Sequence, residues 1–481
     1  MKNASRNFLP HNHFIVWQIF IGLCLLTMLF LLFGSANLDE VEHLRAAYYV
    51  SLGHLPYRDF FEHHHPLLWY IWAPFMSVMP KNTYDTLYIA RAAGLLISLL
   101  TGVYIYKIEK KFIGGKVAAL LCLSLYLASF RTLSVLLYVK PDTYMRLFYF
   151  IGLYELFCYF RFQKPRHLNL AAAAFAVGFC FLQTIIPQLI VLAFFAGYFL
   201  YHHRRCVPDF CMAGAIFATI LACFFGFFAL QNAWSAYFEL NWLFNAKLTA
   251  YLSASSTQKV LYFLLFIDLI GFAVAALICR CKQNHNPYFY MLGALFVTEF
   301  VQRFAGWSVY VHYLSFMLIY ASMLAAPLLL RLIKKYRPLG VLLLLWLSLR
   351  LCLNFCGYIF QPHRLKFYES PPQQTFGLLG GIYRPHNAYY WMYPNIECIH
   401  HVFFNPTLNY NINQQITAEK PDILVNPDYS TKTGEFEMIS RTYRLTPEQQ
   451  KILQNHIFDT KILQNYDEIA PNVYRLKSIR P

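Results

Sequence analysis

The stretch NLDEVEHLRAAYYVSLGHLPYRDFFEHHHPLL, residues 37–68, is the segment that decides the fold and the function of this chain. It follows the first long apolar run, yet it gathers acidic, basic and histidine side chains together with several aromatic ones. A loop that only joins two membrane helices can be short and needs none of these groups. We therefore interpret the stretch as part of a reaction site, and the rest of the chain as the frame that presents it.

The composition of the chain is far from that of an average soluble protein. Of its 481 residues, 58% are hydrophobic and 19% are aromatic, whereas only 13% are charged. The first apolar run, residues 14–36, is long enough to cross the ~30 Å of hydrocarbon in a bilayer, and it lacks a small-residue cleavage pattern. We expect a polytopic membrane protein that retains its first helix.

The apolar runs predict about eleven membrane spans. Residues 168–201 are too long for one span, and Gln183, Pro187 and Gln188 indicate a tight turn inside this run. The apolar run 66–79 is too short to cross, which favours a re-entrant or interfacial helix. The eleven predicted spans are residues 14–36, 87–106, 116–130, 143–160, 168–183, 186–201, 210–231, 259–279, 288–303, 311–330 and 339–359.

The positions of Lys and Arg predict the orientation of these spans, because basic residues near span ends stay on the cytoplasmic side. The formal net charge is +16, and basic residues collect in alternate loops. The amino terminus is then inside, the loop 37–86 is outside, and an odd number of spans places the carboxyl terminus outside. Cys398 is the lone cysteine of that terminal part, so no disulfide forms there, as is ordinary for a bacterial periplasmic domain. We expect the bacterial inner (cytoplasmic) membrane.

The chain is predicted to have two domains, a membrane core of residues 1–360 and a small periplasmic α+β domain of residues 361–481. The sequence Thr446-Pro447-Glu448-Gln449 is typical of a capping box that opens a helix, and Asn405-Pro406 of another helix start. Residues 422–425 and 472–476 are predicted strands. The interpretation of this domain as a lid or scaffold is favoured over a role in acceptor binding.

Two adjacent carboxylates, Asp39 and Glu40, stand at the outer mouth of the first span. A partly desolvated carboxylate can act as a general base on a hydroxyl nucleophile. Neighbouring side chains on a backbone turn face different ways, so we assign Asp39 as the base and Glu40 as a positioning or acceptor-binding group. The alternative is that both acids only end a helix and hydrate the interface.

The first loop resembles that of the GT-C membrane glycosyltransferases, in particular the protein O-mannosyltransferases, the aminoarabinose transferase of lipid A and the Rgt-like lipopolysaccharide-core transferases. A Lys-Pro-Asp sequence at residues 140–142 resembles a second motif of this superfamily, usually Arg-Pro-Asp. The resemblance implies a GT-C-like, α-helical polytopic fold. In the first loop it rests on Asp39, Glu40, Gly53, Pro56, Tyr57, Asp59, Pro66 and Leu67.

The resemblance also implies a reaction, the transfer of a sugar from a polyprenyl-phosphate donor to an acceptor hydroxyl with inversion, on the outer membrane face. Asp39 then corresponds to the catalytic carboxylate and Asp142 to a second acid of the site. Lysine at position 140 keeps the positive charge of the usual arginine but loses the fork that grips phosphate with two donors.

A departing monophosphate needs cations, and the outer-side candidates are Arg58, Lys140 and Arg303. Glu299 precedes Arg303 by one helical turn and can orient it. His312 and Tyr313 resemble a family position that faces the sugar or the phosphate. The remaining predicted substrate-binding residues are Tyr57, Asp59 and His65 in the first loop.

No cofactor is required by this interpretation, although a divalent metal is possible. Glu62 and the histidines 63–65 suggest a metal site, but three consecutive side chains cannot all point at one ion, and the spacing fits no zinc motif. Asp268 and Arg350 lie within predicted spans, where we favour structural pairing over function.

The predicted function is an inverting glycosyltransferase whose acceptor is a cell-envelope glycolipid, such as lipopolysaccharide core or lipid A; a protein acceptor stays open. No nucleic acid partner is expected, because the positive charge belongs to the membrane flanks. The alternatives are an O-antigen ligase or polymerase that uses a diphosphate-linked donor, a transporter, and a scaffold that does no chemistry. A transporter is expected to show repeated halves, which this sequence lacks.

Overall fold

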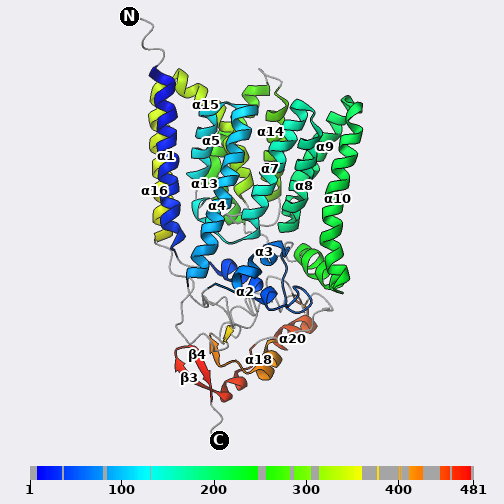
Figure 1. The fold of residues 1–481 in the computed structure, drawn as a ribbon. Coiled ribbons are helices and arrows are strands. Elements are labelled where there is room, and N and C mark those ends of the chain that lie inside the picture. The colour runs from blue at the N-terminus through cyan, green and yellow to red at the C-terminus, as the bar shows by residue number, and fades with distance from the viewer. Residues whose placement is uncertain are drawn as a thin grey trace, which may run out of the picture. The chain divides into compact units, whose positions relative to one another are not determined.

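The chain folds into two compact units in the computed structural model (Figure 1). The helical unit comprises residues 1–34, 91–224 and 252–361, and the mixed unit comprises residues 35–90, 225–251 and 362–481. The mixed unit therefore joins the first loop to two segments that follow it far along the chain. The structure describes residues 8–34, 37–79, 84–129, 132–247, 256–281, 286–304, 314–359, 376–378, 400, 402, 411–425, 445–455 and 458–477.

Each of the eleven predicted spans coincides with a helix. In the described part of the chain, seven helices are long and apolar enough to cross a membrane. Of the others, α5 and α8 are short and α7 and α14 carry ionisable side chains. The helices are α1 (Phe8–Leu32), α4 (Tyr84–Ile108), α5 (Lys116–Leu127), α7 (Pro141–Phe162), α8 (Pro165–Phe181), α9 (Ile186–His202), α10 (Val207–Leu230), α13 (Ser256–Cys281), α14 (Pro287–Phe304), α15 (Ser315–Lys335) and α16 (Arg337–Ile359).

Shorter elements connect these helices. The predicted turn between α8 and α9 is confirmed as a 3-10 turn, η2 (Gln183–Ile185). The short helix predicted in the first loop is confirmed as α3 (Leu67–Met76), which is too short to span. Its re-entrant or interfacial position stays a prediction. The remaining helices are α2 (Leu38–Ser51), η1 (Glu109–Ile113), α6 (Thr132–Leu137), η3 (Arg204–Cys206), α11 (Trp234–Phe238), η4 (Glu239–Phe244), α18 (Ile412–Glu419), α20 (Pro447–Asn455) and η7 (Thr460–Asn465).

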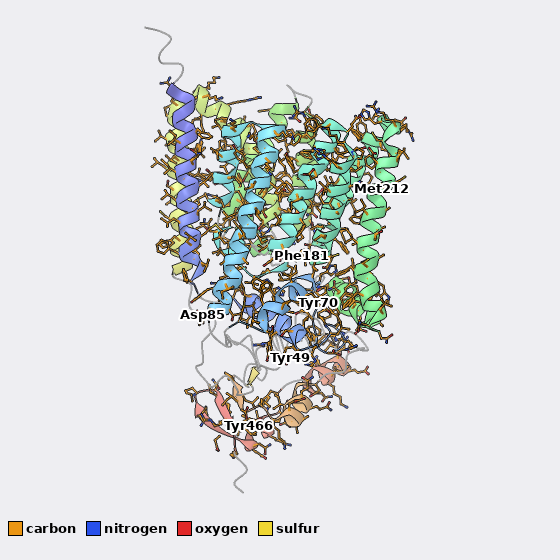
Figure 2. The ribbon with its side chains drawn as sticks, in the orientation of Figure 1. Tyr49, Tyr70, Asp85, Phe181, Met212 and Tyr466 are labelled. Carbon is orange, nitrogen blue, oxygen red and sulfur yellow. The ribbon has the colours of Figure 1, made fainter. Side chains whose placement is uncertain are left out.

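Helix α15 forms the centre of the helical unit. It packs against α5, α13 and α14, and 83% of its most apolar stretch is buried. On α10, by contrast, Met212 is 57% exposed, and Figure 2 shows its side chain at the edge of the helices. Apolar side chains that face outward in this way suit a hydrocarbon surrounding, where they lose nothing by remaining exposed.

Helices α7 and α8 pack closely because the α7 residue at their contact is a glycine, which has no side chain. A Cβ added at Gly152 of α7 would lie 2.6 Å from the ring of Phe175 on α8. Near the other end of the pair, Phe181, labelled in Figure 2, stacks on Tyr144 and Phe148 with ring centroids 5.4 and 5.6 Å away. These contacts fix the start of α7, which carries the second predicted motif.

Two polar side chains of α16 are paired inside the helical unit, and the sequence predicts the first of these pairings. Arg350 of α16 donates to Asp268 of α13 over 2.6 Å, and it also donates to the carbonyl of Leu265. The side-chain amide of Asn354, also on α16, donates to the carbonyls of Ala128 and Ser129, each over 3.0 Å. These two carbonyls follow the end of α5, and the Ser129 carbonyl also accepts the backbone N–H of Thr132 over 3.1 Å. A distant helix thus supplies a donor to the carbonyls where α5 ends.

The carboxyl-terminal part of the mixed unit contains a four-stranded sheet in the order β1-β2-β4-β3. Its strands are β1 (Phe376–Leu378), β2 (Ile423–Val425), β3 (Tyr466–Ala470) and β4 (Val473–Leu476). β1 runs parallel to β2, and the other two pairs are antiparallel. The two predicted strands are thus confirmed as β2 and β4. Ile416, Leu424, Phe458 and Tyr466 form the core beneath the sheet.

The predicted capping box is also present. The backbone N–H of Gln449 donates to the Thr446 hydroxyl, and the backbone N–H of Thr446 donates to the Gln449 side chain, over 3.3 and 2.9 Å. Helix α20 begins between these residues at Pro447. The predicted helix start at Asn405-Pro406 lies outside the described residues.

Candidate functional site

The first loop begins with a helix, so the two predicted acids do not stand on a free backbone turn. Asn37 caps α2: its side chain accepts a hydrogen bond from the backbone N–H of Asp39, and its own backbone N–H donates to Glu40 over 3.0 Å. Asp39 is therefore the second residue of a helix and is half-buried, whereas Glu40 is the third and is fully buried. The expectation of a turn is wrong because the Asn-x-x-Glu spacing makes a capping box.

The capping box gives the two acids different surroundings. The carboxylate of Glu40 is held against the backbone at the start of its own helix. Asp39 lies in the same turn, where the N-terminal end of the helix dipole stabilises a negative charge. The separate roles that the sequence suggests for these residues stay a prediction.

The Gly-x-x-Pro-Tyr-x-Asp motif forms a tight turn. The carboxylate of Asp59 accepts the backbone N–H of Leu55 over 2.7 Å, and the backbone N–H of Tyr57 donates to the carbonyl of Phe60 over 3.0 Å. Gly53 and Tyr57 both have positive φ, of +91° and +69°. A tyrosine in this region is strained and persists only where its surroundings hold it.

Tyr57 is held by its buried side chain. Its hydroxyl donates to the carbonyl of His64, and its ring lies 5.3 Å from that of Tyr237. The ring is fully buried, so a substrate could reach it only by entering the packing.

Arg58, a predicted phosphate ligand, is engaged by its neighbour. Its guanidinium donates two hydrogen bonds to the two carboxylate oxygens of Asp59, over 2.7 and 2.9 Å. This pairing lowers the pKa of Asp59, although burial opposes it, and it raises the pKa of Arg58. A donor phosphate would compete with Asp59 for the same fork.

The segment that follows α10 anchors the histidine run, and sequence reasoning missed it. Asn241 and Asn245 both donate to the carbonyl of His63, over 3.3 and 2.6 Å. The Tyr237 hydroxyl lies 3.0 Å from Nε2 of His65, which is fully buried. A signal was present in two asparagines one helical turn apart within an aromatic segment, but their shared partner lies 178 and 182 residues away along the chain.

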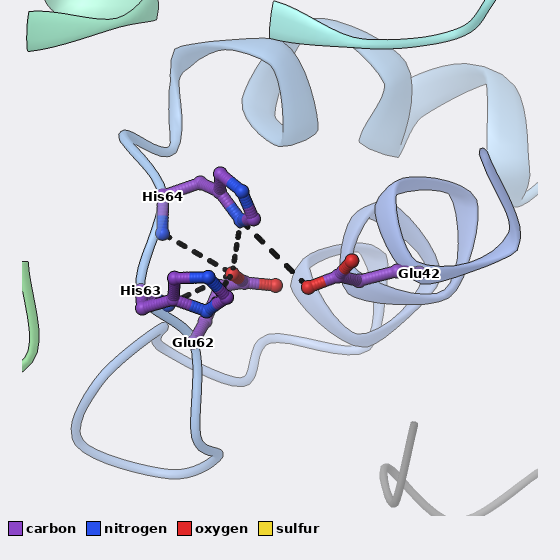
Figure 3. A group of neighbouring side chains, drawn as sticks. All are labelled: Glu42, Glu62, His63 and His64. Atoms are coloured by element: carbon purple, nitrogen blue, oxygen red, sulfur yellow. Dashed lines mark hydrogen bonds and ion pairs between the residues drawn. The ribbon is translucent and has the colours of Figure 1, made fainter. Parts of the chain in front are cut away.

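Four ionisable side chains meet beside this anchored run (Figure 3). Glu42 comes from α2, and Glu62, His63 and His64 come from the loop. Nδ1 of His64 lies 2.8 Å from Oε1 of Glu62 and 3.7 Å from Oε1 of Glu42. Nδ1 of His63 lies 3.7 Å from Oε1 of Glu62, beyond hydrogen-bonding distance.

The electrostatics of this group follow from its burial. Burial raises the pKa of Glu62, but the hydrogen bond from His64 and the electrostatic interactions with the neighbouring imidazoles outweigh it and lower the pKa well below its usual range. Burial lowers the pKa of His63 to about 3, and the charges of Glu62 and Asp39 only partly oppose it. His63 is therefore neutral at physiological pH.

In the helical unit, the second motif also begins a helix, but here without a side-chain cap. Lys140 precedes α7, Pro141 is its first residue and Asp142 its second. Asp142 is half-buried, and its backbone carbonyl accepts a hydrogen bond from Arg146 over 3.1 Å. Lys140 is buried, with its ammonium 5.7 Å from the ring centre of Tyr138.

The predicted pairing of Glu299 with Arg303 is confirmed. Both side chains are buried on α14, and Nε of Arg303 donates to Glu299 over 3.3 Å. His312 and Tyr313 lie outside the described residues. The predicted site residues therefore fall into two sets, with Asp39, Glu40, Tyr57, Arg58, Asp59 and His65 in the mixed unit and Lys140, Asp142 and Arg303 in the helical unit.

Comparisons with known proteins concern the family and the fold of this chain. Residues 63–228 match the model of the dolichyl-phosphate-mannose-protein mannosyltransferase family. The structure is similar to that of ArnT from Cupriavidus metallidurans, solved bound to undecaprenyl phosphate, with a TM-score of 0.51 and 15% identity. The match covers 65% of this chain and 60% of the ArnT chain. No curated protein matches the sequence. The chain has the GT-C fold of the membrane glycosyltransferases, as its first loop predicts.

Proposed function

We propose that the protein is an inverting glycosyltransferase that moves a sugar from a polyprenyl-phosphate donor to a hydroxyl group of a cell-envelope acceptor. The observation that carries the proposal is the position of Asp39, a half-buried carboxylate in a capped first helical turn. The family match of residues 63–228 and the fold shared with ArnT support it.

In this reaction Asp39 accepts the proton of the acceptor hydroxyl as that oxygen attacks the anomeric carbon. The bond from the anomeric carbon to the phosphate oxygen breaks, and the polyprenyl monophosphate leaves with the electron pair. The capping box keeps Asp39 in place, because rotating the first turn of α2 would break two hydrogen bonds. Cations stabilise the leaving phosphate, and we assign Arg58, Lys140 and Arg303 to this role.

The proposed acceptor is an envelope glycolipid, such as lipopolysaccharide core or lipid A. The support for this choice is the resemblance of the first loop to the transferases of lipid A and lipopolysaccharide core, which rests on Asp39, Glu40 and the motif from Gly53 to Asp59. The proposed site of action is the outer face of a bacterial inner membrane.

The test of the reaction is the variant Asp39→Asn, assayed with polyprenyl-phosphate sugars and envelope lipid extracts, with products identified by mass spectrometry. We expect transfer to fall by a factor of about 10² to 10⁴, the usual contribution of a general base. Asp85→Asn is the matched control, because Asp85 also lies in the first turn of a helix but is exposed. Equal transfer by Asp39→Asn and wild type would show that Asp39 is not the base, and release of a lipid diphosphate would favour the ligase or polymerase alternative.

The proposed topology has its own test. His54 is exposed in the first loop, and Arg204 is exposed between α9 and α10, on opposite sides in the predicted orientation. In whole spheroplasts we expect a membrane-impermeant maleimide to label His54→Cys above the background of the unmodified chain, and Arg204→Cys only after permeabilisation. The reverse pattern would invert the topology and exclude transfer on the outer face by this loop.

A further inference from the structure

We propose that Glu42, Glu62, His63 and His64 bind a divalent transition metal of the zinc class, in a closed structural site that joins the first loop to α2. The four side chains supply two imidazole nitrogens and two carboxylate oxygens, all within 4.8 Å of one another. The metal would stabilise the conformation of the first loop and would take no part in the transfer reaction.

The donor set fits zinc better than the hard cations. Ca²⁺ and Mg²⁺ prefer oxygen ligands alone, whereas zinc combines imidazole with carboxylate in four-coordinate sites. With metal–ligand bonds of about 2.0–2.1 Å, ligand atoms in a tetrahedral site lie roughly 3.4 Å apart. The two separations of 3.7 Å, from His63 to Glu62 and from His64 to Glu42, are close to this value.

One contact must change when the ion binds. The 2.8 Å contact between His64 and Glu62 is a hydrogen bond, which is too short for two ligands of one ion. Binding would replace the proton on Nδ1 of His64 by the metal, with the remaining ring proton on Nε2, and would let Nδ1 and the Glu62 oxygen separate by about half an ångström.

The strongest single indication is His63. Its Nδ1 is buried and has no hydrogen-bond partner, although the atom lies on the side of the ring toward Glu62. A buried nitrogen without a partner costs free energy, and a metal ion would satisfy it.

The surroundings hold these ligands in position. The backbone N–H groups of His63 and His64 both donate to Glu62, over 2.8 and 3.2 Å. The carbonyl of His63 accepts the amides of Asn241 and Asn245, and the carbonyl of His64 accepts the Tyr57 hydroxyl. Such a second layer of hydrogen bonds is typical of metal sites. Figure 3 shows why the run of three histidines does not exclude the site, since two of them face the carboxylates, while His65 pairs with Tyr237.

The experiment measures metal content, not transfer. Full-length protein purified through a tag without histidine is stripped with EDTA, desalted, incubated with ZnCl₂ and desalted again, and its zinc is determined by elemental mass spectrometry. We expect one zinc per chain for the wild type and a higher unfolding temperature with zinc than without. Substituted Co²⁺ should show the intense visible absorption of a tetrahedral site.

Two ligand variants and two controls decide the location. Glu42→Gln and His63→Gln should each lose most of the bound zinc and the shift in unfolding temperature. His54→Gln removes an exposed histidine of the same loop. Glu155→Gln removes a carboxylate from another cluster of possible metal ligands, which it forms with Cys158 and His167. Both variants should keep one zinc. If His63→Gln does not fold, the near-isosteric Glu42→Gln decides alone.

The proposal is overturned if the wild type retains no zinc, or if Glu42→Gln binds zinc as the wild type does. Asp39→Asn separates this inference from the proposed function, because it should lose transfer and keep its zinc. Transfer that depends on Asp39 in a protein without zinc would leave the function standing and reject the metal site.

Discussion

Gly53 adopts a φ of +91°, which glycine reaches without strain, and an added Cβ would meet no atom within 4 Å. A substitution at Gly53 therefore introduces backbone strain without a steric clash. We expect Gly53→Ala to destabilise the protein by about 1 kcal/mol, the usual cost of a left-handed conformation for a residue with a side chain. The measurement is the unfolding temperature in detergent.

Gly197→Ala is the control for this prediction, because Gly197 lies in α9 with equally open space and no positive φ. We expect it to leave the unfolding temperature unchanged or to raise it, since alanine is the better helix former. Equal effects of the two substitutions would contradict the account of the turn at Gly53.

At the scale of single elements, the start of α2 is a capped helical turn where the sequence suggested a free backbone turn. The cap at Asn37 orders the turn that contains Asp39. Replacing this cap by alanine should cost about 1 kcal/mol of stability and let the first turn fray, so Asn37→Ala should lower both the unfolding temperature and the rate of transfer.

Asn37→Ser tests the cause, because serine caps helices about as well as asparagine. It should keep both properties close to those of the wild type. A loss of transfer in Asn37→Ser without a loss of stability would instead give the Asn37 amide a direct part in the reaction.

For the molecule as a whole, His400 links the carboxyl-terminal segment to η4 within the mixed unit. Its Nε2 lies 2.6 Å from Glu239, and its ring packs on Phe61 and Phe244. Burial lowers the pKa of His400 below the value of 6.5 that it has when unfolded, and the bond to Glu239 opposes this only in part. Glu239 is the charged residue that its ring contacts, and Phe61 and Phe244 are apolar.

This pKa difference predicts a loss of stability in acid. Between the folded and unfolded pKa values the unfolded chain binds more protons, so stability is fully present above pH 6.5 and declines as the pH falls below it. We expect the drop in unfolding temperature from pH 7.5 to pH 5.5 to be smaller in His400→Gln than in the wild type. An identical drop in both proteins would show that His400 does not contribute.

Features of the fold and the site that depend on residues close together in the sequence could be predicted. Features that depend on residues far apart in the sequence could not. The spans follow from local apolar runs, and the Thr446–Gln449 capping box from a four-residue pattern, so both were predictable. The partner of His65 is Tyr237, 172 residues away, and no local pattern specifies such a pairing. The fork between Arg58 and Asp59 was missed for another reason, since adjacent residues seldom pair and the turn at Tyr57 is what allows it.

The bridge from Asn354 to the end of α5 has a consequence for biosynthesis. The Asn354 amide is made 226 residues after the Ala128 carbonyl and 225 residues after the Ser129 carbonyl, which also accepts the nearby backbone N–H of Thr132. While the ribosome synthesises that interval, α5 is in the membrane and the Ala128 carbonyl lacks this donor in a medium that offers few others. Insertion therefore has to tolerate an incomplete bundle, and a nascent chain arrested before α16 should be a good substrate for insertases and membrane proteases.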